Sequence, residues 1–215
     1  MIIAANFIEG KKAKNCIVST VSHNTAAEKQ YRNPTEYGTP KPETSTFTTT
    51  GGAAILLTNE KTKVKIESST IGKIVDKGTK DVNHMGAVMA PAAAETIYEH
   101  LTKLKRTPDY YDLILTGDLG KVGLNILKEY YEKVYNERLN KIMDAGDEIF
   151  LETSQYSGGS GPVCLPLVFF TKILKNKKYK KILIVGSGSL HNPTLVNQGK
   201  EIPAISHLVK IEVLL

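Results

Sequence analysis

The sequence has little cysteine, no tryptophan and no long hydrophobic run, and these scarcities exclude several classes of protein. The two cysteines, Cys16 and Cys164, lie far apart, and neither belongs to a C-x-x-C or mixed Cys/His spacing. This pattern argues against a disulfide framework and against a zinc site. The longest apolar stretch, residues 162–170, is far shorter than the ~20 residues that a membrane span needs, and no signal peptide opens the chain. We therefore expect an intracellular, soluble protein.

Positive charge is present but is concentrated in one place. The formal net charge is +6, and six lysines fall within residues 172–181, a stretch that contains no acidic residue. They are Lys172, Lys175, Lys177, Lys178, Lys180 and Lys181. A patch of this kind suits nucleic acid or an anionic membrane surface. A charge run is more often a solvated helix end, and we favour that interpretation.

Hydrophobic patterning predicts alternating strands and helices, and hence an α/β fold whose sheet is covered on both faces. Strands are expected at residues 15–22, 46–58, 63–75, 112–116, 148–152, 182–185 and 205–214. A first helix is expected to begin at Pro91, with Ile97, Leu101 and Leu104 on its apolar face. A second follows residues 117–120, with the stripe Ile126, Leu127, Tyr130, Tyr131 and Val134, and a third runs from the glycines at 158–161 to about Leu174. Residues 24–45 are expected to form a long loop, and residues 186–199 a turn region.

The two ends of the chain have the same order of expected elements. Each has the end of a helix, a lysine-rich approach, a strand, a connection and a second strand, and each first strand leads to a His-Asn pair. The pairs are His23-Asn24 and His191-Asn192. The order suggests an internal duplication whose first copy is short. We therefore divide the chain into a remnant of a first half, residues 1–60, and a second half, residues 61–215.

Several irregular blocks carry a resemblance to a known family. They are T-A-A-E-K-Q-Y-R at 25–32, P-T-E-Y-G at 34–38, M-G-A-V-M-A-P-A-A-A at 85–94, D-L-I-L-T-G-D-L-G at 112–120, G-G-S-G at 158–161 and I-P-A-I-S-H at 202–207. In this order they resemble the stage V sporulation protein AD family of endospore-forming bacteria. The resemblance implies a thiolase-like (condensing-enzyme-like) layered α/β/α fold. It makes residues 1–60 a fragment of the N-terminal half and residues 61–215 a nearly complete C-terminal half.

The resemblance also implies a function. It implies a non-catalytic protein that binds dipicolinic acid, within the sporulation machinery that moves dipicolinate into the developing spore and out at germination. The implied partners are dipicolinic acid and other membrane proteins of the stage V sporulation A operon, with a homodimer left open and no nucleic acid. The implied location is intracellular and peripheral at the forespore inner membrane. In the family, a cysteine at the nucleophile-like position precedes the helix in which Met1 falls, so its role is not transferred to Cys16 or Cys164.

The residues themselves argue against condensing chemistry. Claisen or acyl-transfer catalysis needs a thiolate, a polarising His or Asn pair and an oxyanion hole. Where condensing enzymes place the His and the Asn, this chain has Gly117-Asp118 and the glycines at 158–161. Cys164 has apolar neighbours, and we expect it to be buried and inert with a raised thiol pKa. We expect no cofactor and no enzyme activity; a thiolase-like acyltransferase and a purely structural assembly partner stay open as alternatives.

Binding of a small anion is better supported by the sequence. The run Gly158, Gly159, Ser160 and Gly161 is expected to open a helix, where free N–H groups attract anions; a tight packing turn is an equal alternative. By the resemblance, Gly186 and Gly188 flank the ligand pocket, and their G-x-G spacing is not a dinucleotide fingerprint. His207 is a further candidate contact, although a packed histidine at a strand start would look the same. Three residues of the long loop are candidates for closing over the pocket or for forming a dimer contact: Arg32, Glu36 and Tyr37.

Overall fold

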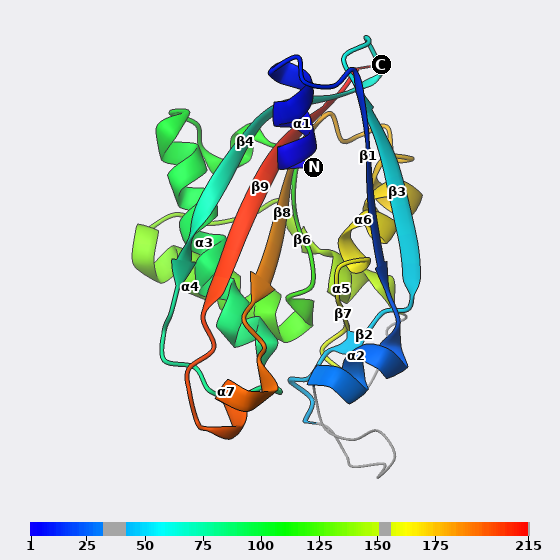
Figure 1. Ribbon diagram of the computed structural model, residues 1–215. Coiled ribbons are helices and arrows are strands. Elements are labelled where there is room, and N and C mark those ends of the chain that lie inside the picture. Colours follow the sequence, from blue (N-terminus) through cyan, green and yellow to red (C-terminus); the bar gives the residue numbers. More distant parts are fainter. Residues whose placement is uncertain (32–41, 151–155, 215) are drawn as a thin grey trace.

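A five-stranded mixed sheet forms the centre of the molecule (Figure 1). The computed structural model describes residues 1–31, 42–150 and 156–214. The strand order is β4 (Val64–Val75), β9 (Ala204–Val213), β8 (Lys181–Ser189), β5 (Leu113–Thr116) and β6 (Ile142–Asp144). β9 runs antiparallel to both of its neighbours, whereas β8, β5 and β6 run parallel to one another. The alternation of strands and helices therefore builds the α/β sheet that the sequence predicts.

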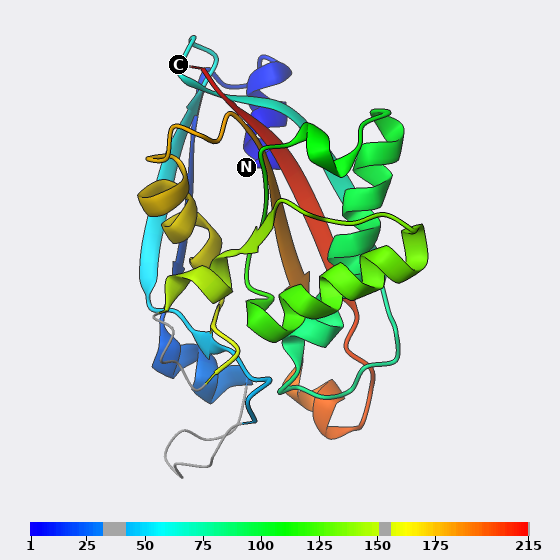
Figure 2. The same cartoon turned by 180° about the vertical axis from the view of Figure 1, so that it is seen from behind.

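One face of this sheet is covered by α3 (Met85–Lys103) and α4 (Gly120–Tyr135), which lie in front of it in Figure 2. Their fully buried residues, such as Ile97 and Leu127, pack with Leu183 of the sheet in one hydrophobic core. The two helices meet at Gly86 and Gly123. A Cβ added to either glycine would lie 2.6 Å from the Cα of the other, so the backbones approach each other as only glycine permits.

The opposite face is covered by α1 (Ile2–Glu9), α6 (Cys164–Val168) and the single-turn π-helix η3 (Phe169–Ile173). Beyond these helices lie β1 (Asn15–Ser22) and β3 (Gly51–Thr58), which pair antiparallel as a separate two-stranded sheet (Figure 1). The layers are therefore helix, sheet, helix and sheet. The remaining elements are α2 (Asn24–Tyr31), β2 (Phe47–Thr48), η2 (Pro108–Tyr110), α5 (Ala145–Ile149), β7 (Gly159–Ser160) and α7 (Pro193–Asn197).

The order of elements at the two ends of the chain repeats in three dimensions. α1, β1, α2 and β3 correspond to η3, β8, α7 and β9, and both strand pairs are antiparallel. α2 begins at Asn24 and α7 follows Asn192, so each His-Asn pair leads into a helix. Asn192 caps its helix by accepting hydrogen bonds from the backbone N–H groups of Thr194 and Leu195. The division of the chain at residue 60 stays a prediction.

The predicted helix start at Pro91 is wrong. α3 begins at Met85, with the His84 side chain accepting from the Ala87 N–H, and Pro91 lies buried inside the helix. A proline normally disfavours the turn before it. Here Met85, Val88 and Met89 are buried in the core, and burial of that size outweighs the missing hydrogen bond. The expected apolar face also ends early, because Leu104 is the exposed C-cap residue.

The other wrong predictions concern the connections. The strand expected at 148–152 begins inside the helix α5, residues 145–149, and residues 151–155 lie outside the described part. The strand in this region is the shorter β6, which precedes α5. The start of the expected loop at 24–45 is the helix α2, and the expected turn at 186–199 contains the end of β8 and α7. Val134 is 52% exposed and lies off the buried stripe of α4. Arg32, Glu36 and Tyr37 lie outside the described residues.

Candidate functional site

A cleft of about 1170 Å³ opens between the five-stranded sheet and the β1–β3 side of the molecule. Its walls come from both repeats: Met1 and Ile3 at the start of α1, Ser22 at the end of β1, and Ser189 at the end of β8 all line it. The volume exceeds the ~300–1000 Å³ of most small-molecule sites, so a small ligand would occupy one part of the cleft.

Two glycines leave one wall of the cleft bare. Ile184, Gly186 and Gly188 alternate along β8, and all three line the cleft. A Cβ added to Gly188 would meet no atom within 4 Å, and one on Gly186 would meet only the His207 carbonyl oxygen at 3.9 Å. The glycines are therefore not needed for packing, and they let a ligand approach the backbone.

The same stretch of β8 has an unpaired edge. β5 ends at Thr116, which lies opposite Val185, so no described strand pairs with β8 on that side beyond Val185. Within residues 186–189 the Ser189 carbonyl accepts from the His191 N–H at 3.0 Å and the Gly186 carbonyl accepts from the Ser206 hydroxyl at 3.0 Å. The other backbone groups on this edge are left for solvent or a ligand, since each strand residue carries one donor and one acceptor. Gly117 and Asp118, which follow β5, line the cleft next to this edge.

His207 presents a defined hydrogen-bond donor to the cleft. It lies opposite Gly186 on β9 and lines the cleft. The backbone N–H of Gly72 donates to its Nδ1 at 3.2 Å. In the neutral ring the proton must then be on Nε2, because one nitrogen accepts while the other carries the hydrogen. His207 can therefore donate to a carboxylate oxygen without being charged.

The glycine run at 158–161 does not open a helix, and that prediction is wrong. Gly159 and Ser160 form β7, which pairs with β2, and α6 begins only at Cys164. Gly158 and Gly159 lie behind the cleft and are not among its lining residues; a Cβ on Gly159 would clash with the Ile149 side chain at 2.5 Å. Gly158 and Gly159 are therefore packing residues, and only the second half of the run lines the cleft.

Ser160 and Gly161 do line the cleft, together with Asp118. The backbone N–H of Gly161 donates to Asp118 Oδ2 at 3.2 Å, so an amide that the sequence suggested for an anion is already in use. Gly161 has φ +93°, a backbone conformation that glycine adopts readily. Of the seven candidate ligand residues, the structure thus brings five to the cleft: Ser160, Gly161, Gly186, Gly188 and His207.

Asp144 holds this region together, and the sequence reasoning missed it. Its buried carboxylate accepts hydrogen bonds from the Thr116 hydroxyl at 2.6 Å and from backbone N–H groups of Leu119, Gly120, Gly146 and Asp147. Burial raises the pKa of Asp144 above its ordinary value, and the hydrogen bonds oppose that rise. The carboxylate thereby fixes the turn that carries Asp118. The signal in the sequence was an aspartate followed by A-G-D-E, which is typical of a helix N-cap.

Two further histidines line the cleft, His23 and His191. They come from the two His-Asn pairs and so occupy corresponding corners of the two repeats, at the ends of β1 and β8. The sequence reasoning used these pairs to infer a duplication but gave neither histidine a role. No local sequence pattern predicts that both histidines line one cleft, because this depends on how the two repeats pack against each other.

Neither cysteine lines the cleft. Cys164 is fully buried beneath it, with Sγ 2.9 Å from Thr49 Oγ1 and 3.2 Å from the Ser160 carbonyl oxygen. Burial raises the pKa of the Cys164 thiol to about 12. The expectation that Cys164 is a buried thiol is confirmed. Cys16, on β1, is half-buried.

The described residues also bear on metal sites and on membrane spans. Across residues 1–31, 42–150 and 156–214, no group of three or more His, Cys, Asp or Glu side chains is arranged to hold a metal ion. In the same residues, no helix combines the length and apolar character needed to cross a bilayer.

Comparison with known proteins identifies the family. The sequence model described as "Stage V sporulation protein AD" matches residues 1–212. The stage V sporulation protein AD of Bacillus subtilis (strain 168) is 41% identical over 214 residues, which are 98% of this chain and 63% of that protein. The chain belongs to the stage V sporulation protein AD family. It spans 63% of the length of this relative.

Solved structures show the fold. A 3-oxoacyl-[acyl-carrier-protein] synthase III from Aquifex aeolicus VF5 matches with a TM-score of 0.55 at 16% identity, over 98% of this chain and 62% of that one. The tetronic acid condensing enzyme AbyA1 matches with a TM-score of 0.59 at 13% identity, over 98% of this chain and 63% of that one. At these identities the likeness concerns the fold alone. The expected thiolase-like α/β fold of condensing enzymes is confirmed.

Proposed function

We propose that the chain binds dipicolinate without converting it, as a component of the sporulation machinery that moves this compound into the developing spore and out again at germination. Membership of the stage V sporulation protein AD family supports the role in sporulation. The observation that carries the binding is the bare glycine wall of β8 beside the His207 donor. Together they offer hydrogen-bond donors around open space.

The chemistry of dipicolinate fits this part of the cleft. The molecule is a flat pyridine ring with two carboxylates, so it presents several acceptors and no strong donor. The His207 ring and the unpaired edge of β8 supply donors, Ser160 lines the same part of the cleft, and Ile184 and Val209 supply an apolar surface for the pyridine ring. Asp118, which lines the cleft next to the β8 edge, would repel a dianion, so we expect the carboxylates on the β9 side of this wall, near His207.

Two other functions are alternatives to dipicolinate binding, and a different observation would establish each. The thiolase-like fold favours an acyltransferase, but both thiols of the chain lie outside the cleft lining, and thiol-based acyl transfer needs a thiolate at the substrate. Turnover of an acyl-CoA would establish that alternative. A purely structural assembly partner would join its complex and show no affinity for small molecules. We further propose that the chain acts at the forespore inner membrane, peripherally and beside membrane proteins of the same operon, with no nucleic-acid partner; this part is supported by family membership.

Calorimetric titration with dipicolinate tests the proposal. We expect wild-type protein to bind, and Gly188→Leu to lose at least tenfold in affinity, because the new side chain would fill the cleft without meeting the protein. The matched control is Gly52→Leu. Gly52 lies on β3 outside the cleft lining, and its added Cβ would meet only the Thr20 carbonyl oxygen at 3.7 Å.

Three results would contradict the proposal. They are the absence of heat at millimolar dipicolinate, an equal loss of affinity in both variants, and unchanged affinity in Gly188→Leu. Circular dichroism of the two variants shows whether each retains the wild-type fold before its affinity is compared.

A further inference from the structure

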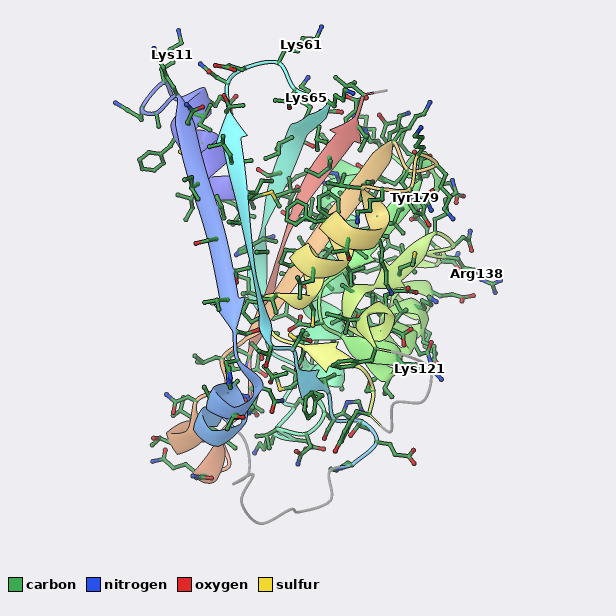
Figure 3. All side chains as sticks on the ribbon, turned by 90° about the vertical axis from the view of Figure 1, so that its right-hand side faces the viewer. Lys11, Lys61, Lys65, Lys121, Arg138 and Tyr179 are labelled. Carbon is green, nitrogen blue, oxygen red and sulfur yellow. The ribbon has the colours of Figure 1, made fainter. Side chains whose placement is uncertain are left out.

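Eleven lysines gather at one end of the molecule, which we call the lysine end. They come from three turns that are far apart in the sequence. These are Lys11, Lys12 and Lys14 between α1 and β1; Lys61, Lys63 and Lys65 at the start of β4; and Lys175, Lys177, Lys178, Lys180 and Lys181 before β8. Lys11, Lys61 and Lys65 stand together at the upper end of Figure 3, far from Lys121 of α4.

Backbone hydrogen bonds hold the three turns together. The Asn59 N–H donates to the Lys14 carbonyl at 3.3 Å, the Leu214 N–H to the Lys63 carbonyl at 2.7 Å, and the Val213 N–H to the Lys180 carbonyl at 2.8 Å. Each bond joins a lysine-bearing turn to the end of a neighbouring strand. The clustering is therefore built into the sheet ends and does not depend on the conformation of long side chains.

The lysine end carries the excess positive charge of the whole chain. Four acidic residues lie in or against these segments, Glu9, Glu60, Asp112 and Glu212, against eleven lysines and a total net charge of +6. Ten of the eleven lysines are exposed, and only Lys181 is half-buried. Within the described residues none of the eleven forms an ion pair. An end of this kind attracts anions over a broad surface.

The side chains at the lysine end favour a bilayer over nucleic acid. The eleven cations are all lysines, whereas base reading relies on arginine. Arg138 pairs with Glu132 elsewhere, and Arg106, which lies over the same Tyr110 ring as Lys181, is paired with Glu67. The ring of Tyr179, the aromatic residue within the lysine run at 172–181, already has Lys178 Nζ over one face, 4.6 Å from its centroid, which leaves at most one face for stacking on a base. None of the lysines lines the cleft.

Apolar side chains stand exposed among the lysines. Phe7 is 53% exposed, and its carbonyl accepts from the Lys12 N–H; Leu214 is 40% exposed and bonds to Lys63. Exposed aromatic and aliphatic tips between lysines are typical of surfaces that lie against a lipid interface, where the apolar groups enter the headgroup region and the lysines stay at the phosphates.

We propose that the lysine end binds the anionic surface of a lipid bilayer directly. The inference rests on the proposed peripheral location, to which it gives a physical basis, and it is independent of what binds in the cleft. β8 runs from Lys181 at the lysine end to Ser189 at the cleft, about 26 Å at ~3.3 Å per residue. Binding through the lysine end therefore leaves the β8 end of the cleft facing away from the bilayer.

Vesicle co-sedimentation of the full chain tests the proposal. We expect binding to vesicles of phosphatidylcholine mixed with phosphatidylglycerol, weakening with added salt, and little binding to phosphatidylcholine alone. The triple variants K11Q/K12Q/K14Q and K177Q/K178Q/K180Q should each lose about a hundredfold in partition coefficient. The matched control K121Q/K128Q/K133Q removes the same charge from α4 and should bind as the wild type does.

Each alternative outcome overturns the proposal. Equal losses in the α4 control would show that only net charge matters. Equal binding to both kinds of vesicle, or binding to neither, would show that the lysine end does not recognise anionic lipid. Lysine-dependent retention of a short DNA or RNA duplex without vesicle binding would assign the lysine end to nucleic acid. Dipicolinate titration of the same preparations separates any such failure from a failure of the cleft proposal.

Discussion

The stability of the protein should fall between pH 7 and pH 5 because of one buried histidine. His100 of α3 is 1% exposed, and its ring nitrogens lie 2.8 Å from Thr70 Oγ1 and 2.7 Å from the Tyr111 hydroxyl. Burial, and secondarily the Arg106 charge, lower the pKa of His100 from 6.5 to about 4. The folded ring is thus neutral at a pH where the unfolded one is protonated.

The sign and size of the effect follow from linkage. Between pH 6.5 and 4 the unfolded chain binds a proton that the folded chain does not, so the stability contributed by neutral His100 is present above pH 6.5 and is lost progressively as the pH falls towards 4. From these two pKa values, lowering the pH from 7 to 5 costs about 2 kcal/mol of unfolding free energy.

Urea unfolding at both pH values measures this cost. The variant His100→Gln cannot titrate and can still hydrogen-bond, so its loss of stability between pH 7 and pH 5 should be smaller than the wild-type loss by about 2 kcal/mol. Carboxylates contribute equally in both proteins and cancel in the comparison. If wild type and variant lose the same amount, His100 is not the group responsible and the reasoning is refuted.

Two predictions concern the glycine contacts and the buried thiol. Gly86→Ala should cost about 1–3 kcal/mol, because its Cβ would lie within 3 Å of backbone atoms of Gly123 and Leu119; Gly188→Ala should leave the melting temperature nearly unchanged, and equal melting of the two variants would contradict this. Cys164 should resist iodoacetamide until the protein is unfolded, because burial raises its pKa to about 12. Peptide mass mapping measures this, and alkylation of native Cys164 at the rate of an exposed thiol would refute it.

Local patterns predicted three long strands well, because their hydrophobic periodicity is strong, whereas the start of the long helix α3 was predicted six residues late, at Pro91. The strand at 15–22 has the predicted bounds, β4 begins one residue later than predicted and ends as predicted, and β9 begins and ends one residue earlier than predicted. Short elements failed, since three or five residues carry too little periodicity. β6 has three residues and was not predicted, and the five-residue helix α5 overlaps the start of the strand expected at 148–152.

The candidate site was only partly predictable for a different physical reason. Gly186, Gly188 and His207 converge through the β8–β9 register, which opposes Gly186 to His207 across sequence positions 21 apart, and the family resemblance supplied what periodicity does not. The donor at His207 depends on Gly72 of a third strand. The use of the Gly161 amide by Asp118 likewise depends on a contact between residues 43 apart, which no local pattern indicates.

A crystal structure of the protein with dipicolinate tests the central claim most directly. The account predicts density for the ligand against Gly186 and Gly188 of β8, with one carboxylate oxygen within hydrogen-bond distance of His207 Nε2. Density for intact dipicolinate at another surface, with this wall of the cleft empty at saturating ligand, would contradict it.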